Sequence, residues 1–379
     1  MALTLDAETA LLRETALEFF REKAPVAALR KLRDDQDPTG FSRPLWREIA
    51  SLGWAGFLVP EEFGGADFGH LGLGQVMEAA GRTLAATPLL STALIGASAL
   101  RLAGSADQKQ AHLPALAAGE RITALALEEH AHHAPFHIAT RAERTRSGFR
   151  LSGKKLFVLD GHMADLIIAV ARTSGREDER RGITLFLVPA ESHGLTRRRT
   201  VLVDSRNAAI LEFAKVEVGE DSVLGRVDEG GDILEAVLDH ARAGLAAEMV
   251  GSASAAFERT LQYLKDRKQF GVPIGSFQAL KHRAAELFCE IELARSAVLA
   301  ALSAIDAKAN DAAQLASIAK AKAGDAFFLA GNEGVQMHGG IGMTDEHEIG
   351  FFLKRARVAQ AAFGDSPFHR DRYASLQGY

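Results

Sequence analysis

The sequence predicts an α+β protein with an N-terminal helical domain, a middle β-barrel domain and a C-terminal four-helix bundle. Two observations lead to this fold class. Apolar residues recur at helical spacing towards both ends of the chain, whereas short runs of β-branched and aromatic residues, separated by polar turns, occupy its middle. With 379 residues, of which 47% are hydrophobic and 25% charged, the chain has ample material for several cores. We place the domains at residues 1–119, 120–225 and 226–379.

The first region, residues 1–119, is expected to be helical. Leu12, Ala16 and Phe19 share one face of a first helix that ends at Pro25. Further helices are predicted for residues 71–84, 91–102 and 106–118.

The middle region, residues 120–225, contains many short strand-like runs, which favour a small antiparallel barrel. The basic run Arg197–Arg199 fits a solvated strand or hairpin better than a polyanion site. Four histidines, at positions 130, 132, 133 and 137, have no cysteine nearby and lack the spacing of a structural zinc site. We therefore expect a surface loop and no metal.

The last region returns to helical spacing. Helices are predicted for residues 232–265, for a long stretch beginning near Ser276, for residues 312–337 and for a segment that begins near Asp345. The hydroxyl of Ser276 is a plausible N-cap for the long helix. Its apolar face and its length indicate one member of a bundle rather than a surface helix.

Composition excludes several functional classes. The net charge of −5 gives no reason to expect nucleic acid or an anionic membrane as a partner. Cys289 is the only cysteine, so no internal disulfide is possible. No apolar run reaches the roughly 20 residues that a membrane-spanning helix needs, and the first residues do not read as a secretory signal. We expect a cytoplasmic protein.

A charged turn precedes the long helix. Arg267, Gln269 and Phe270 stand together beside Gly271, just before a helix N-terminus. A guanidinium and free backbone amides at such a place suit a phosphate. An ordinary solvated turn would have the same spacing, so the residues alone leave both interpretations open.

Four segments resemble the acyl-CoA dehydrogenase family, in the right order and over nearly the whole chain. They are GWAGFLVPEEFGG (53–65), LDHAR (238–242), RKQFGVPIGSFQALKHRAAEL (267–287) and QMHGGIGMTDE (336–346). The resemblance implies the three-domain fold and an FAD-dependent dehydrogenation of an acyl-CoA to the trans-2-enoyl-CoA. It also implies an electron acceptor such as an electron-transfer flavoprotein.

The resemblance also assigns ligand contacts. It places FAD against Arg267, Gln269, Phe270, Gln278, Gln336, Gly339 and Gly340, with Phe157 packed on the flavin ring. Asp239 and Arg242 would lie beside the acyl-CoA channel, although an i, i+3 ion pair on the helix surface explains them equally well. Because the flavin of this family lies at a dimer interface, a homo-oligomer or a heterotetramer with a homologous subunit is expected.

The departures from the family concern the catalytic base. The two positions at which family members carry the glutamate that removes the substrate α-proton hold Phe363 and Ala241. Asp365 is the nearest carboxylate and a candidate displaced base, but Asp365-Ser366-Pro367 also reads as a helix start, which we favour. In the flavin pocket, threonines are replaced by Glu128 and Leu159.

Three functions remain open from the sequence. The leading one is a flavoprotein that oxidises an acyl-CoA to the trans-2-enoyl-CoA, alone or within an assembly. The alternatives are a subunit without its own catalysis that completes a partner's FAD site, and a flavin oxidase acting on a substrate that is not a thioester. The empty glutamate positions favour the second function beyond what family membership alone would suggest.

Overall fold

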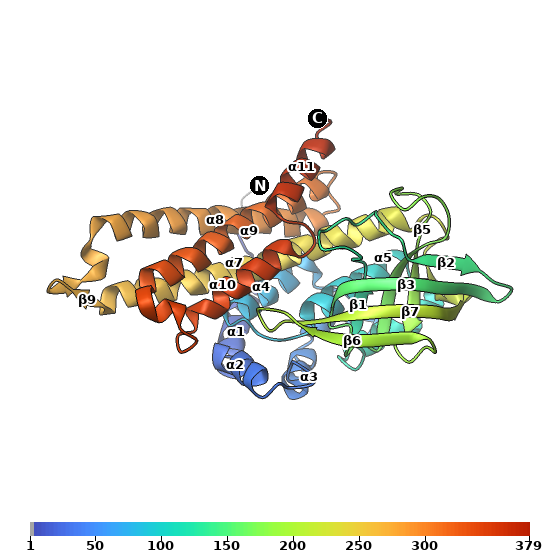
Figure 1. Cartoon of the computed structure of the whole chain (residues 1–379), viewed down its shortest axis with the longest axis horizontal. Coiled ribbons are helices and arrows are strands. Elements are labelled where there is room, and N and C mark those ends of the chain that lie inside the picture. Colours follow the sequence, from blue (N-terminus) through green and yellow to red (C-terminus); the bar gives the residue numbers. More distant parts are fainter. Residues whose placement is uncertain (1–3) are drawn as a thin grey trace. The chain divides into compact units, whose positions relative to one another are not determined.

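The computed structural model describes residues 4–379 (Figure 1). By their internal contacts these residues form two compact units. One combines the segment up to Asp35 with His70–Ala85 and Arg242–Tyr379, and the other combines Gln36–Gly69 with Ala86–Ala241. The predicted order of N-terminal helices, a sheet in the middle and C-terminal helices is confirmed. Among residues 4–379, no helix has both the length and the apolar character needed to cross a bilayer.

The N-terminal part is helical, as predicted. Its elements are α1 (Ala7–Lys23), α2 (Val26–Asp34), α3 (Arg43–Ser51), η1 (Trp54–Gly56), η2 (Glu61–Phe63), α4 (Gly69–Arg82), η3 (Leu89–Gly96), α5 (Ala97–Ala103) and α6 (Ala106–Ala117). Local capping explains several starts: Asp6, Ser42 and Ser105 each accept a hydrogen bond from a first-turn amide.

The middle part forms one eight-stranded sheet in the order β6-β7-β3-β2-β4-β5-β8, with β1 paired to β4. The strands are β1 (Thr123–Ala126), β2 (Arg141–Arg144), β3 (Gly148–Leu159), β4 (Leu166–Arg172), β5 (Ile183–Pro189), β6 (Leu195–Val201), β7 (Asn207–Gly219) and β8 (Val223–Leu224), with the short η4 (Glu220–Ser222) between the last two. Most pairs are antiparallel, but β4 pairs in parallel with both β1 and β2, and β1 and β4 are fully buried. A fully buried strand cannot alternate apolar and polar residues, which explains their continuous apolar runs.

A π-helix, η3, packs against strand β1. Every residue of η3 is buried, and Gly96 lies so close to the sheet that a Cβ there would be 2.0 Å from Thr123 Oγ1. Glycine is therefore required at this contact.

The C-terminal elements are α7 (Gly230–Asp266), β9 (Lys268–Gln269), β10 (Val272–Pro273), η5 (Ile274–Ser276), α8 (Gln278–Asp306), α9 (Ala312–His338), η6 (Gly339–Met343), α10 (Ile349–Ala361) and α11 (Ser366–Leu376). Helix α9 packs against α8, α10 and α11 (Figure 1). The prediction that Ser276 caps the long helix is wrong, because α8 begins at Gln278. Ser276 lies in η5, and its hydroxyl donates to the Pro273 carbonyl instead.

Candidate functional site

The charged turn lies between α7 and α8. The amide of Arg267 donates to the Tyr263 carbonyl at 2.9 Å, and the Ile274 amide closes the turn onto the Arg267 carbonyl at 2.8 Å. Phe270 adopts a left-handed φ of 54° and is 91% exposed. Among residues 4–379, no carboxylate pairs with the Arg267 guanidinium. An exposed cation without a counter-ion is thus held at a defined place.

The end of helix α9 lies near this turn. His338 is buried, and its ring lies 4.4 Å from the rings of both Tyr263 and His347. Burial lowers the pKa of His338, which keeps the ring neutral at pH 7. Tyr263 precedes Arg267 by one helical turn and His338 directly precedes Gly339, so this stack brings the two predicted segments to the same end of the helices.

Gly339 and Gly340 leave this end open. Gly339 has a φ of 64°, and a Cβ built on either glycine would meet no atom within 4 Å. Gln336 on α9 and Gln278, the first residue of α8, lie at the same end of the helices. Two side-chain amides, a guanidinium without a carboxylate partner and glycines that leave room for a ligand fit the phosphates of a dinucleotide.

The middle sheet carries an acidic residue paired with a histidine, in contrast to the basic turn between α7 and α8. Glu128 follows strand β1, and its carboxylate lies 2.5 Å from His133 Nδ1. The Glu128 carbonyl accepts from the Leu156 amide at 2.7 Å, next to Phe157, which is 46% exposed with a φ of 50°. Phe157 is thus available to pack on a planar ligand. At the two positions that the resemblance aligns with flavin-bonding threonines, the chain has a paired carboxylate and the side chain of Leu159, and neither supplies the hydroxyl group expected there.

The loop that follows β1 is stabilised by the buried side chains of Glu129 and Lys155. Glu129 accepts from the amides of Ala139 and Thr140, and lies 2.7 Å from Nζ of Lys155, which is fully buried. The side chain of His133 is only 4% exposed, so the predicted surface loop is wrong for this histidine. No cluster of His, Cys, Asp or Glu in residues 4–379 has the arrangement to hold a metal ion.

The positions of the family glutamate are buried and apolar. Phe363 is 9% exposed and Ala241 is fully buried. The Arg242 guanidinium donates from Nε to the Phe363 carbonyl at 3.3 Å, which brings a predicted substrate residue to the glutamate position. Asp239, one turn before Arg242, is 7% exposed and Arg242 is fully buried, so the alternative that places the two residues on the helix surface is wrong.

Asp365 is exposed and caps helix α11. Its Oδ1 accepts from the Phe368 amide at 2.9 Å, as the N-cap interpretation predicts. This bond gives Asp365 a structural role.

Sequence reasoning missed two buried basic side chains near the loop of residues 362–364, which precedes α11. Lys320 on α9 donates to the carbonyls of Gln360 and Gly364, and Nε2 of His369 lies 3.1 Å from the Phe363 carbonyl. A signal was present for Lys320, because it falls on the same helical face as the buried Ala316, Ala323 and Phe327.

Family models match three consecutive parts of the chain. They describe the N-terminal domain (residues 6–120), the middle domain (127–216) and the C-terminal domain (228–375) of acyl-CoA dehydrogenase. The chain is 31% identical to probable acyl-CoA dehydrogenase YngJ of Bacillus subtilis, over 98% of both chains. This chain belongs to the acyl-CoA dehydrogenase family. Membership of this family supports an oxidoreductase that works with a flavin.

Solved structures share the whole fold. A variant of the Tcur3481-Tcur3483 steroid ACAD superposes with a TM-score of 0.89 at 31% identity, over 99% of both chains. The ChsE4-ChsE5 complex from Mycobacterium tuberculosis superposes with a TM-score of 0.90 at 25% identity, over 100% of this chain and 99% of the other.

Proposed function

We propose that this chain is a subunit of a heteromeric, FAD-dependent acyl-CoA dehydrogenase and completes the FAD site of a homologous partner that carries the catalytic base. The assembly oxidises an acyl-CoA thioester to the trans-2-enoyl-CoA and passes the electrons to an acceptor such as an electron-transfer flavoprotein. One observation carries the proposal. Both glutamate positions are buried and apolar, at Phe363 and Ala241, whereas the charged turn proposed to bind phosphate remains exposed.

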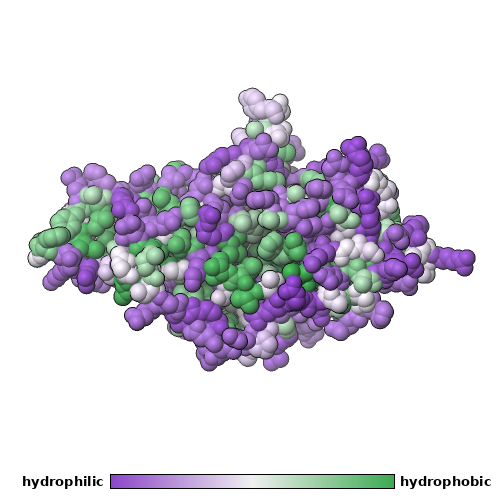
Figure 2. Space-filling view, in the orientation of Figure 1, coloured by the Kyte–Doolittle hydropathy of each residue, from purple (hydrophilic) through white to green (hydrophobic). Residues whose placement is uncertain are grey.

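Three further features support a heteromer. The sheet offers the Glu128–His133 pair where a flavin would need hydroxyl groups. Apolar residues gather on the surface at the β9 end of α7 and α8 (Figure 2), where Phe270, Val272 and Phe277 are exposed. Such a patch is typical of an interface. The ChsE4-ChsE5 structure, which shares the fold, is a complex of two named proteins.

The proposal assigns a role to the polar residues of the charged turn and to those at the C-terminal end of α9. Bound FAD would supply the acceptor for the substrate β-hydride. Arg267 would neutralise its pyrophosphate, and the open space at Gly339 and Gly340 would let the backbone approach it closely. Gln269, Gln278 and Gln336 would donate to the remaining polar groups, and Phe270 would cover the apolar part. Asp239 and Arg242 would border the acyl-CoA channel.

Co-purification tests the proposed heteromer. The chain is expressed with each homologous acyl-CoA dehydrogenase encoded beside it, and the product is analysed by native mass spectrometry and flavin absorbance. We expect an assembly of two different chains that contains fewer flavins than chains. A homomer with one FAD per chain would contradict the proposal.

A second candidate is a homomeric dehydrogenase in which the Glu128–His133 pair itself supplies the base. A carboxylate paired with a histidine is a common proton-transfer arrangement. In that case Glu128→Gln would abolish flavin reduction in a homomer, whereas the heteromer proposal expects it to leave the assembly's turnover within a few-fold of the wild type.

Replacing Arg267 by alanine is expected to release flavin. Loss of one charge-assisted contact to the pyrophosphate costs about 1.5–3 kcal/mol, which corresponds to roughly 10- to 150-fold weaker binding. Flavin content after dialysis and the FAD dissociation constant of the co-purified assembly measure this loss. Lys268→Ala, at the neighbouring exposed position, is the control and should retain its flavin; equal retention by Arg267→Ala would remove the turn from the FAD site.

A further inference from the structure

The loop Ala362–Gly364 is held by its carbonyl groups. The Phe363 carbonyl accepts from Arg242 Nε at 3.3 Å and lies 3.1 Å from His369 Nε2, and the Gly364 carbonyl accepts from Lys320 Nζ at 2.8 Å. Because a carbonyl only accepts, Nε2 of His369 must carry the ring proton. Three basic side chains from α7, α9 and α11 therefore converge on two adjacent peptide groups.

The backbone that they hold is strained. Phe363 has a φ of 56° and Gly364 a φ of 101°, and a non-glycine residue in the left-handed region costs free energy that its surroundings must offset. The three basic side chains are at most 1% exposed, so solvent does not replace these hydrogen bonds. The hydrogen bonds from Arg242, Lys320 and His369 thus fix the backbone at residue 363.

Several basic groups lie close to one another around the Ala362–Gly364 loop. Lys320 faces Arg242 on α7 and Asp365 at the start of α11, and His369 faces Lys320, Arg242 and Arg372. Asp365 is exposed and caps its helix. Burial, followed by the charge of Arg242, lowers the pKa of Lys320 to about 7, and burial, followed by the charge of Lys320, lowers the pKa of His369 to about 2. His369 is therefore neutral, and Lys320 gains or loses its proton near neutral pH.

We propose that Lys320 is a proton-sensitive latch that positions the Ala362–Gly364 loop, with Arg242 and His369 as its fixed partners. The neutral amine still donates to the Gly364 and Gln360 carbonyls and avoids the cost of a second buried cation beside Arg242. When the amine takes a proton, the free energy of the closed loop rises relative to that of the opened loop. The latch concerns the protein around residue 363 and does not depend on the proposed heteromer.

The sign of the pH effect follows from linkage. Opening of the loop exposes Lys320 to water, where its pKa returns to about 10.5. The opened state then binds more protons than the closed state between about pH 7 and pH 10.5, so opening becomes less favourable as pH rises through this window. Below about pH 7 both states are protonated and the dependence vanishes. For one proton, the limiting change is about tenfold per pH unit.

Hydrogen exchange of the full-length chain tests the latch. Protection of the amides of residues 362–369 is measured at pH 7, 8 and 9 and corrected for the intrinsic exchange rates. We expect protection to rise by up to about tenfold per pH unit in the wild type and to be independent of pH in Lys320→Met. Lys320→Gln, which keeps a donor but cannot titrate, should remain protected and independent of pH.

A neighbouring lysine supplies the matched control. Lys322 lies on the same helix and pairs with Glu290 at 2.5 Å, so Lys322→Met should keep the wild-type slope. A wild-type chain whose loop protection does not change from pH 7 to 9 would overturn the proposal without any mutant. An unchanged slope in Lys320→Met or Lys320→Gln would also overturn it. Because no flavin, partner or substrate enters this measurement, its failure leaves the heteromer proposal standing.

Discussion

Flavin reduction by acyl-CoA is expected to be at least about 10²-fold slower with this chain alone than with the co-purified assembly. General-base removal of a proton contributes about 10²–10⁴-fold to rate, and Phe363 and Ala241 leave both family glutamate positions without a carboxylate. Stopped-flow absorbance at the flavin band, with a panel of acyl-CoAs and added FAD, measures both rates. A rapid reduction by the isolated chain would show that it carries its own base.

Two variants test separately whether Asp365 is the base and whether the chain lacks only its base. Asparagine retains the capping ability of Asp365 but cannot accept a proton, so Asp365→Asn should leave every rate unchanged. Phe363→Glu should not accelerate the isolated chain, because the sheet lacks the hydroxyl groups that would hold the flavin ring. A gain of about 10²-fold or more in Phe363→Glu would instead identify a homomeric dehydrogenase that has lost only its base.

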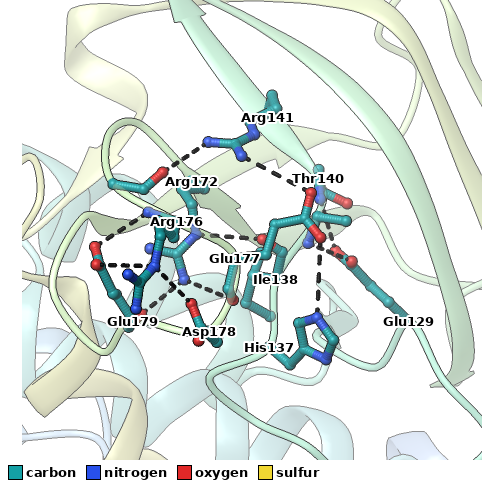
Figure 3. A network of polar contacts seen from close by, with 12 residues as sticks. Glu129, His137, Ile138, Thr140, Arg141, Arg172, Arg176, Glu177, Asp178 and Glu179 are labelled. Atoms are coloured by element: carbon teal, nitrogen blue, oxygen red, sulfur yellow. Dashed lines mark hydrogen bonds and ion pairs between the residues drawn. The ribbon is translucent and has the colours of Figure 1, made fainter.

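Replacing Arg172 by methionine is expected to destabilise the protein by at least about 3 kcal/mol. Arg172 ends strand β4 and is 1% exposed, and its N–H groups are shared among six backbone carbonyls of two loops. Figure 3 labels three of the accepting residues, Ile138, Glu177 and Glu179. The accepting residues are Phe136, Ile138, Ser174, Glu177, Glu179 and Arg181. Methionine fills part of the volume but leaves buried carbonyls without donors, and each such group costs about 1–3 kcal/mol.

Thermal unfolding and limited proteolysis at residues 173–182 measure this loss. Arg176→Met is the control, because Arg176 lies in the same loop with a side chain that is 75% exposed, and its replacement should change stability by less than about 0.5 kcal/mol. Arg172→Lys should also be destabilised, since an ammonium has about three donors where the guanidinium has about five. Equal stability of Arg172→Met and Arg176→Met would show that the carbonyls find other donors.

Local patterns in the sequence were sufficient for the fold class and for several element boundaries. Asp365-Ser366-Pro367 predicted the start of α11 because an N-cap depends on neighbouring residues alone. Ser276 failed as the cap of α8 because its hydroxyl donates to the Pro273 carbonyl within a competing turn. Cap chemistry identifies candidates, and the geometry of the turn selects among them.

The sequence by itself determined the family motifs, the charged turn before α8 and the absence of a glutamate at positions 241 and 363. Only the tertiary structure decided what surrounds those positions. Lys320, Arg242 and His369 are far apart in the chain and come from three helices, so no local pattern could show that they share the carbonyls of one loop. The same holds for Arg172, whose donors reach loops before and after its own strand. Burial and hydrogen-bond partners are properties of packing between distant segments, and the chemistry of a buried charge follows from them.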